Sequence, residues 1–198
     1  MGALVTPIPL RSSDELGDEE LVRRALDGER WGRELLYRRH VRWLLAMTAR
    51  ILASSTEAEE IVQDTFMRAF ARLPTLREPA AFRGWLGQIG VSLAGQRMRR
   101  LRLMRRLGLD RGIDDATLET LADTSVPADQ RAELAMIDRV LGRMKAPLRI
   151  AWMLRHVESL ELTEVASMCG CSLATAKRRI AEADAILDRH VATVGGAP

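Results

Sequence analysis

The stretch TEVASMCGCSLATAKRRIAEADAIL, residues 163–187, contains two short helical patterns separated by a glycine. Two helices that meet at a tight angle need a small residue where they cross and a glycine in the turn. Ala166 and Gly170 meet these needs, and Ser172 is a good N-cap for the second helix. The stretch therefore predicts a helix-turn-helix, whose second helix buries the apolar residues Ala176, Ile180, Ala183 and Leu187.

Basic and small polar side chains crowd the first two turns of this second helix. In a DNA-binding helix-turn-helix, these turns meet base edges and phosphates. Glu182 and Asp184 follow and should repel phosphate, which restricts the expected contact surface. The alternative is a helical hairpin with a solvated basic face. We predict DNA contacts from Ser172, Leu173, Ala174, Thr175, Lys177, Arg178 and Arg179.

The remainder of the chain is also predicted to be helical. Only 4% of its 198 residues are aromatic, and glycine and proline lack the regular spacing of all-β proteins. A strongly acidic stretch divides two sets of helical patterns. We expect an all-α protein of two small helical domains, joined by an acidic flexible linker, the second ending in the helix-turn-helix. The expected boundaries are 1–17 for a disordered tail, 18–107 for the first domain, 108–130 for the linker, 131–191 for the second domain and 192–198 for another tail.

Local signals predict where the helices of the first domain begin. Asp18 is the expected N-cap of the first helix, and Gly28 closes it. Thr56 and Glu59 form a capping-box signature for a later helix. Pro79 stands at a favourable first-turn position, so a further helix should begin there.

That further helix ends in RMRRLRLMRR, residues 97–106, with six arginines in ten residues. Six cations within three turns cannot all be buried, and phosphate is the polyanion that suits them. A helix on a membrane surface and a merely solvated face are the alternatives. The acidic linker that follows argues against an anionic bilayer. Phe82 and Trp85 could stack on bases, but their helical spacing with other apolar residues favours the core.

Catalysis and metal binding are not expected, and we predict no cofactor. The three histidines, His40, His156 and His190, stand near no second ligand cluster or nucleophile, and no glycine-rich phosphate loop is present. Cys169 and Cys171 have the wrong spacing for a zinc site and suit small core positions. Their possible redox role is left open.

No membrane insertion is expected either. The longest apolar stretch, near residues 43–52, is too short to cross a bilayer, and no secretory leader is evident. Two cysteines are too few for a disulfide scaffold and suit a reducing cytosol, so we expect a cytoplasmic protein.

Three segments, in this order, resemble the sigma factors of bacterial RNA polymerase. STEAEEIVQDTFMRAFARL, residues 55–73, resembles their core-polymerase-binding helix. AFRGWLGQI, residues 81–89, resembles the start of their promoter-melting helix, and LTEVASMCGCSLATAKRRI, residues 162–180, resembles their terminal helix-turn-helix. The order, the acidic linker and the length match the minimal extracytoplasmic-function (ECF) type of the sigma-70 family, across roughly residues 18 to 190.

The resemblance implies a division of labour between the domains. The first, region-two-like domain would bind core polymerase, recognise the minus-ten element and melt it. The second, region-four-like domain would recognise the minus-thirty-five element. A pocket for a flipped base can offset the few kcal/mol that unstacking costs. An acidic helix start would face basic residues of the polymerase, although it is also favourable helix electrostatics.

These roles would fall to residues of the matching segments, of the connector before residue 79, and of the helix and arginine run that follow it. The core-polymerase set is Glu59, Glu60, Gln63, Asp64, Met67 and Arg68. The melting set is Arg77, Arg83, Gln88, Ser92, Gln96, Arg97, Arg99, Arg100 and Arg102. Members usually carry Asn and Asp where this chain has Ser92 and Gln96, so the identity of the captured base stays open.

The implied partners are bacterial RNA polymerase core, promoter DNA and an anti-sigma factor, because members are often held inactive by such a partner between the two domains. A competing hypothesis is an operator-binding regulator that uses the same helix-turn-helix without core polymerase. Its amino-terminal helices would then serve as a dimerisation or sensing domain. Tight binding to duplex DNA by the protein alone would distinguish it.

Overall fold

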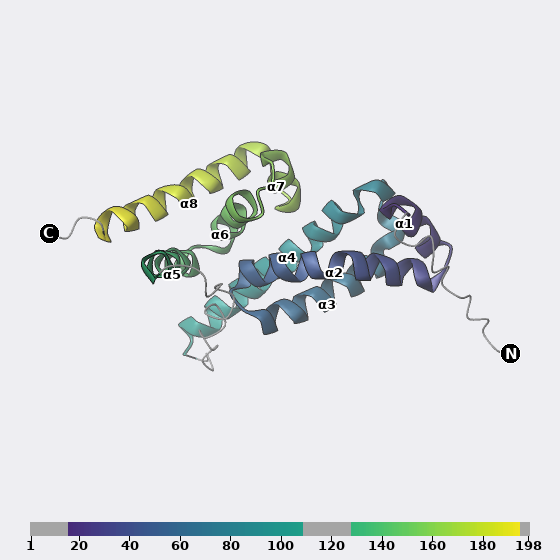
Figure 1. The fold of residues 1–198 in the computed structure, drawn as a ribbon, viewed down its shortest axis with the longest axis horizontal. Coiled ribbons are helices and arrows are strands. Elements are labelled where there is room, and N and C mark those ends of the chain that lie inside the picture. Colours follow the sequence, from purple (N-terminus) through teal and green to yellow (C-terminus); the bar gives the residue numbers. More distant parts are fainter. Residues whose placement is uncertain (1–15, 109–127, 195–198) are drawn as a thin grey trace.

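The computed structural model describes residues 16–108 and 128–194, and every regular element in these ranges is helical (Figure 1). This confirms the expected all-α class. The first unit, residues 16–108, contains α1 (Asp18–Leu26), α2 (Arg30–Leu52), α3 (Ser55–Arg72), η1 (Leu73–Thr75), η2 (Pro79–Ala81) and α4 (Phe82–Arg106). The second unit, residues 128–194, contains α5 (Ala128–Arg143), α6 (Ala146–Trp152), the π-helical turn η4 (Met153–Val157), α7 (Leu162–Met168) and α8 (Leu173–Val194).

The expected tails and linker lie largely outside the described residues. Two boundaries nevertheless differ from expectation. α5 begins at Ala128, within the stretch assigned to the linker, and α8 extends to Val194, beyond the expected end of the second domain. Acidic composition alone could not distinguish the start of a helix from a linker, because acidic residues are also favourable in a first helical turn.

The helices of the first unit pack around a continuous apolar core. Fully buried members come from every α-helix of the unit, so each helix turns one apolar face inward. Phe82 is 0% exposed, which confirms its core position, whereas Trp85 stays partly exposed. Burial of a side chain of this size stabilises the fold by about 1.5–3 kcal/mol. The largest fully buried side chains in this unit are Leu21, Leu36, Leu44, Met47, Ile51, Leu73, Phe82 and Leu86.

Two helix starts lie elsewhere than predicted. Ser54 has an extended backbone, and its Oγ accepts a hydrogen bond from the Glu57 amide at 3.3 Å, so Ser54 caps α3 rather than Thr56. Gly17 precedes α1, whose first residue is Asp18. Asp18 is therefore the first helical residue rather than the cap, and its carboxylate accepts hydrogen bonds from His40 Nε2 at 2.7 Å and Arg39 Nη1 at 2.9 Å.

The helix-turn-helix has the local geometry that its sequence predicts. Gly170 takes a φ of +59°, a left-handed conformation that favours glycine, in the turn between α7 and α8. Ser172 Oγ accepts a hydrogen bond from the Thr175 amide at 3.2 Å and so satisfies a free donor at the start of α8. The four predicted apolar residues of α8 are all buried, Ala176 and Ala183 completely.

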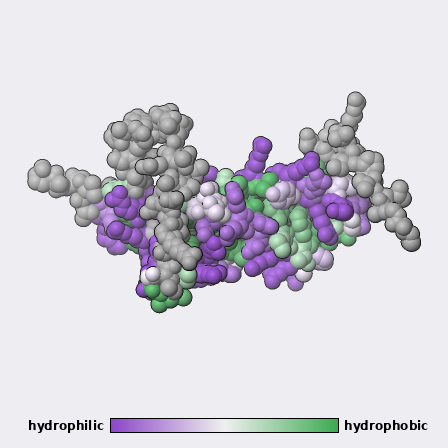
Figure 2. All heavy atoms as spheres, turned by 90° about the horizontal axis from the view of Figure 1, so that it is seen from below, coloured by the Kyte–Doolittle hydropathy of each residue, from purple (hydrophilic) through white to green (hydrophobic). Residues whose placement is uncertain are grey.

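The two units pack against each other along α4. Figure 1 shows α5–α8 on one side of α4, and α4 contacts both α6 and α7. Gly95 of α4 lies against Ile150, and Arg50 of α2 donates a hydrogen bond to Glu158 at 2.7 Å. The described part of the face in Figure 2 is mainly hydrophilic, with apolar patches among the polar residues. None of the described helices is long and apolar enough to cross a lipid bilayer.

Candidate nucleic-acid interface

A row of polar side chains runs along one face of α4. Gln88, Ser92 and Gln96 are spaced four residues apart, which places them on the same side of a helix. All three are exposed, and Gln96 Nε2 lies 3.5 Å from Ser92 Oγ. With Arg99 they line a cavity of about 640 Å³ between the two units. These four of the nine predicted melting residues therefore face the second unit.

Basic residues from other helices also line this cavity. Arg68 and Arg72 come from α3, and Arg179 comes from the start of α8. None of the described residues that line the cavity is acidic. A concave surface of one sign focuses its electrostatic field, so this cavity attracts anions. The structure thus brings residues of both predicted DNA surfaces to one basic cavity.

The predicted residues of α8 divide between two directions. Arg179 is half-buried, lines the cavity and hydrogen-bonds Cys169. Lys177 and Arg178 are exposed, as are Ser172, Leu173 and Ala174 before them. The exposed members, Ser172, Leu173, Ala174, Lys177 and Arg178, can meet a duplex in the present arrangement, while Arg179 is directed towards the first unit.

Asp184 has a structural role that its sequence position did not reveal. Its Oδ1 accepts a hydrogen bond from Trp152 Nε1 at 2.9 Å and lies 3.3 Å from His156 Nε2. The carboxylate therefore joins α8 to α6 and η4. Glu182 remains exposed, so it is the stronger source of the repulsion expected beyond Arg179.

The arginine run at the end of α4 is only partly available to DNA. Arg97 hydrogen-bonds Glu57 and Glu60 of α3, and the bond to Glu57 raises the pKa of its guanidinium against the opposing effect of burial. Arg102 donates to the main-chain oxygen of Arg143 at 2.8 Å. These two residues of the predicted melting set therefore bind other parts of the chain. Arg99 and Arg100, which lie between them in the sequence, are exposed.

The remaining arginines of the melting set lie near the start of α4. Arg77, in the connector before η2, is exposed. Arg83 is also exposed, and its guanidinium carbon lies 4.6 Å from the ring centroid of Trp43. This cation–π contact holds the arginine against the helix bundle.

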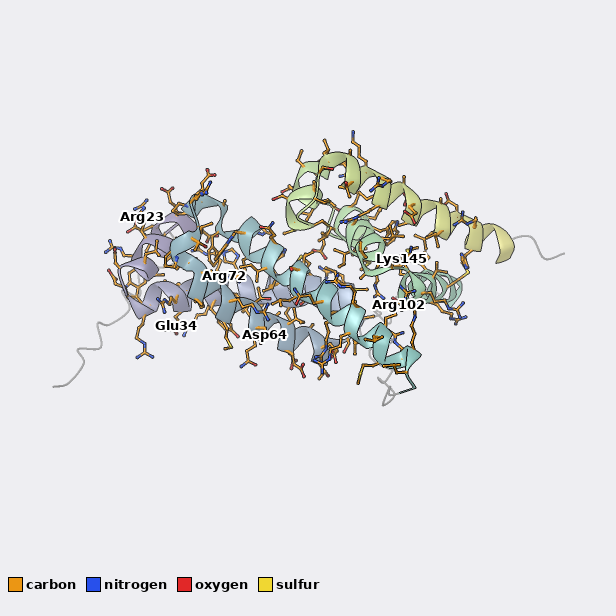
Figure 3. The ribbon with its side chains drawn as sticks, turned by 180° about the vertical axis from the view of Figure 1, so that it is seen from behind. Arg23, Glu34, Asp64, Arg72, Arg102 and Lys145 are labelled. Atoms are coloured by element: carbon orange, nitrogen blue, oxygen red, sulfur yellow. The ribbon has the colours of Figure 1, made fainter. Side chains whose placement is uncertain are left out.

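The six residues predicted to bind core polymerase are all exposed on α3. Met67 is 65% exposed, the most of any large apolar side chain among the described residues. An exposed methionine among charged groups suits a protein interface, where methionine is enriched. Asp64 is labelled in Figure 3 on α3, on the side of the first unit opposite α5–α8. The six are Glu59, Glu60, Gln63, Asp64, Met67 and Arg68.

Two of these six residues also have a place in other features of the structure. Arg68 lines the cavity, and Glu60 pairs with Arg97 at 2.9 Å. Sequence reasoning missed Arg72, although it stands four residues after Arg68 and so shares its helix face. It also missed that Trp85 would line the cavity. Among the described residues, no group of three or more histidine, cysteine or acidic side chains could hold a metal ion.

The described residues thus combine an exposed row on α3, a polar row on α4 and a helix-turn-helix formed by α7 and α8. The sigma-70 region 2 family model matches residues 36–104. The RNA polymerase sigma factor NccH of Alcaligenes xylosoxydans xylosoxydans is 31% identical over 179 residues, covering 88% of this chain and 95% of that protein. The ECF RNA polymerase sigma factor SigM of Mycobacterium tuberculosis is 27% identical, covering 88% of this chain and 85% of that protein.

A solved structure agrees with these relatives. The solved structure of CnrH in complex with the cytosolic domain of CnrY matches this fold with a TM-score of 0.60 and 25% sequence identity. The match covers 89% of this chain and 97% of that chain. The chain belongs to the sigma factors of bacterial RNA polymerase, and within them to the ECF type. It is an alternative sigma factor that acts with RNA polymerase.

Proposed function

We propose that the exposed face of α3 binds RNA polymerase core, that α4 recognises and opens the minus-ten element, and that α8 binds the minus-thirty-five element. The observation that carries this proposal is the row Gln88, Ser92 and Gln96, which lines a basic cavity with Arg179 of the helix-turn-helix. The polymerase would catalyse RNA synthesis, and this chain would select the promoter. Such a protein acts in the cytoplasm, where polymerase and chromosome meet.

The present arrangement supports a further part of the proposal, that the two units separate on a promoter. Elements at minus ten and minus thirty-five lie about 25 base pairs apart, roughly 85 Å at about 3.4 Å per pair. A single cavity of about 640 Å³ holds residues of both predicted DNA surfaces. Residues that share one cavity of this size cannot contact two elements so far apart at the same time, so the units would have to separate.

An anti-sigma partner is also part of the proposal. The structural neighbour CnrH was solved with the cytosolic domain of CnrY. A partner of this chain would act by covering the α4 row or by stabilising the packed arrangement.

Reconstituted transcription tests the proposal. The protein, bacterial core polymerase and a promoter library are combined, and initiation is scored with wild type, a Ser92→Ala/Gln96→Ala double variant and an Arg33→Ala control. We expect initiation that depends on this protein, a large loss in the double variant and none in the control, because Arg33 is exposed on α2 outside the predicted sites. Tight duplex binding by the protein alone, with no initiation from any functional core, would support an operator-binding regulator instead.

A second variant set tests the arginines that follow the row. Arg99→Ala and Arg100→Ala should each weaken promoter binding and reduce its salt slope by about 1, as expected for one lost phosphate contact. Arg97→Ala should reduce the slope less, because Arg97 is already paired with Glu57. An equal effect from all three would show that the Glu57 pair does not persist on DNA.

A further inference from the structure

A second cavity lies at the other end of the interface between the units. It has a volume of about 450 Å³ and lies between the carboxy-terminal half of α4 and the junction of α5 with α6. Figure 3 labels Arg102 and Lys145, which come from different units and lie close to each other in that view. Both line the cavity.

The charge of this cavity is extreme. Six of its lining residues are basic, and none of the described residues that line it is acidic. Its apolar walls come from side chains such as Leu101, Met144 and Pro147. Like charges around one hollow repel one another, and an anion bound there would relieve that repulsion. The six are Arg99, Arg102, Arg105, Arg143, Lys145 and Arg149.

Arg149 is a built component of the site rather than a surface cation. Its residue is only 4% exposed, and its buried Nε has no hydrogen-bond partner among the described residues. Its Nη2 lies 3.9 Å from the Asp138 carboxylate and 3.4 Å from the main-chain oxygen of Arg50. Burial lowers the pKa of this guanidinium, the Asp138 carboxylate opposes the shift, and the charge of Arg105 adds to it. A buried cation with so little compensation is costly for the fold unless another group neutralises it.

The chemistry of the lining residues identifies the class of ligand. A guanidinium presents a planar fork that pairs with two oxygens of a phosphate. Several such forks around one hollow require more than one phosphate. The volume falls within the range of small-molecule sites, which is roughly 300–1,000 Å³. Duplex DNA is stiff over about 150 base pairs and cannot bend into a hollow between packed helices.

We propose that this cavity binds a small ligand that carries at least two phosphate groups. The residues that hold it come from both units. Arg102 comes from α4, Arg143 from the end of α5, Lys145 from the turn between α5 and α6, and Arg149 from α6. A ligand that contacts both units binds only while they are packed together. By linkage it stabilises the packed arrangement and lowers the fraction of protein able to reach both promoter elements. This last consequence rests on the proposed function, whereas the binding itself does not.

Calorimetric titration of the full chain with inorganic tripolyphosphate at constant ionic strength tests the site. We expect one site per chain, and at least tenfold weaker binding in Lys145→Ala and in Arg143→Ala, both exposed residues whose change should leave the fold intact. Arg33→Ala, an equal change of charge on α2, should bind as wild type does. Arg149→Met should abolish binding, with its helical content checked by circular dichroism.

Several results would overturn the site. These are the absence of binding, several equivalent sites, or an equal loss in Arg33→Ala, which would indicate general attraction to a basic protein. Displacement of tripolyphosphate by random-sequence duplex at equal phosphate concentration would assign the surface to DNA instead. Since these titrations contain no polymerase, their failure is separate from a failure of the proposed function. If the site binds, tripolyphosphate at constant free Mg²⁺ should also reduce initiation by wild type and spare Lys145→Ala. Equal inhibition of both proteins under this condition would refute the link to the packed arrangement.

Discussion

Gly87 of α4 faces Met168 of α7 so closely that a Cβ on Gly87 would lie under 3.0 Å from the end of the methionine side chain. The same Cβ would lie 3.1 Å from the Trp43 ring. A glycine at this place therefore lets α4 of the first unit and α7 of the second approach each other. This contact therefore helps to hold the two units together, with the polar row of α4 facing the second unit.

Gly87→Leu should drive the units apart. A leucine must displace both Met168 and the Trp43 ring, and overpacking of this kind costs about 1–3 kcal/mol. Gly84→Leu is the matched control, because it lies on the same helix and a Cβ there would meet nothing within 4 Å. Small-angle scattering should show a larger radius of gyration for Gly87→Leu only. Equal radii in the two variants would contradict the contact.

Substitutions at Arg50 and at Glu158 should lower the free energy of unfolding by different amounts. The Glu158 side chain is 9% exposed and that of Arg50 is 40% exposed, so Arg50→Ala leaves a nearly buried carboxylate unpaired. We expect Arg50→Ala to cost about 1–3 kcal/mol in urea unfolding, and Glu158→Gln to cost less, because an amide needs less compensation.

A surface pair provides the reference for this comparison. Arg38 and Glu34 form an ion pair in which both side chains are well exposed. Arg38→Ala should therefore change the unfolding free energy by at most about 0.5 kcal/mol. A cost for Arg50→Ala no larger than that for Arg38→Ala would show that the Arg50–Glu158 bond does not form in solution.

His40 should make the first unit less stable in mild acid. Burial lowers the pKa of His40 below its usual 6.5, although the Asp18 carboxylate opposes the shift. The unfolded chain then binds the proton more readily than the folded one, so stability is full above the unfolded pKa and declines as pH falls below it. Melting temperature should fall between pH 7.5 and pH 5.5, and less steeply in His40→Gln. Identical pH dependence in both proteins would rule out His40 as the cause.

Cys169 should react slowly with alkylating agents. Burial raises the pKa of its thiol to about 11, so almost none of it is thiolate near neutral pH. Mass spectrometry after iodoacetamide treatment at pH 7.5 should find Cys169 modified far more slowly than a free cysteine, and faster once the chain is unfolded in urea. Equal rates in the folded and unfolded protein would contradict this environment, and would reopen a redox role for this thiol.

Local sequence patterns were sufficient to place the helices and the turn between α7 and α8, but not every point at which a helix begins or ends. The turn at Gly170 and the bond from Thr175 to Ser172 involve neighbours in the chain, so the sequence contains the whole signal. The cap of α3 was misplaced by two residues because Ser54 and Thr56 can both serve, and only the path of the backbone decides between them.

Contacts between distant segments could not be predicted in this way. Arg97 belongs to a run of arginines that resembles a phosphate-binding surface, but its partner Glu57 lies 40 residues earlier. The cavities depend on how two units joined by a linker pack together, which no periodicity encodes. Arg149 in particular reads as one more arginine of a helix until its burial is known.

The distance between the units, measured in the same protein with and without polymerase, tests the central claim most directly. Spin labels at Arg33→Cys on α2 and Asp188→Cys on α8, both exposed positions, would be placed in a chain whose two native cysteines are serine. Double electron–electron resonance should give one short distance for the free protein and a distance longer by tens of ångströms in the complex with core polymerase and promoter. The same short distance in a complex that initiates transcription would contradict the account.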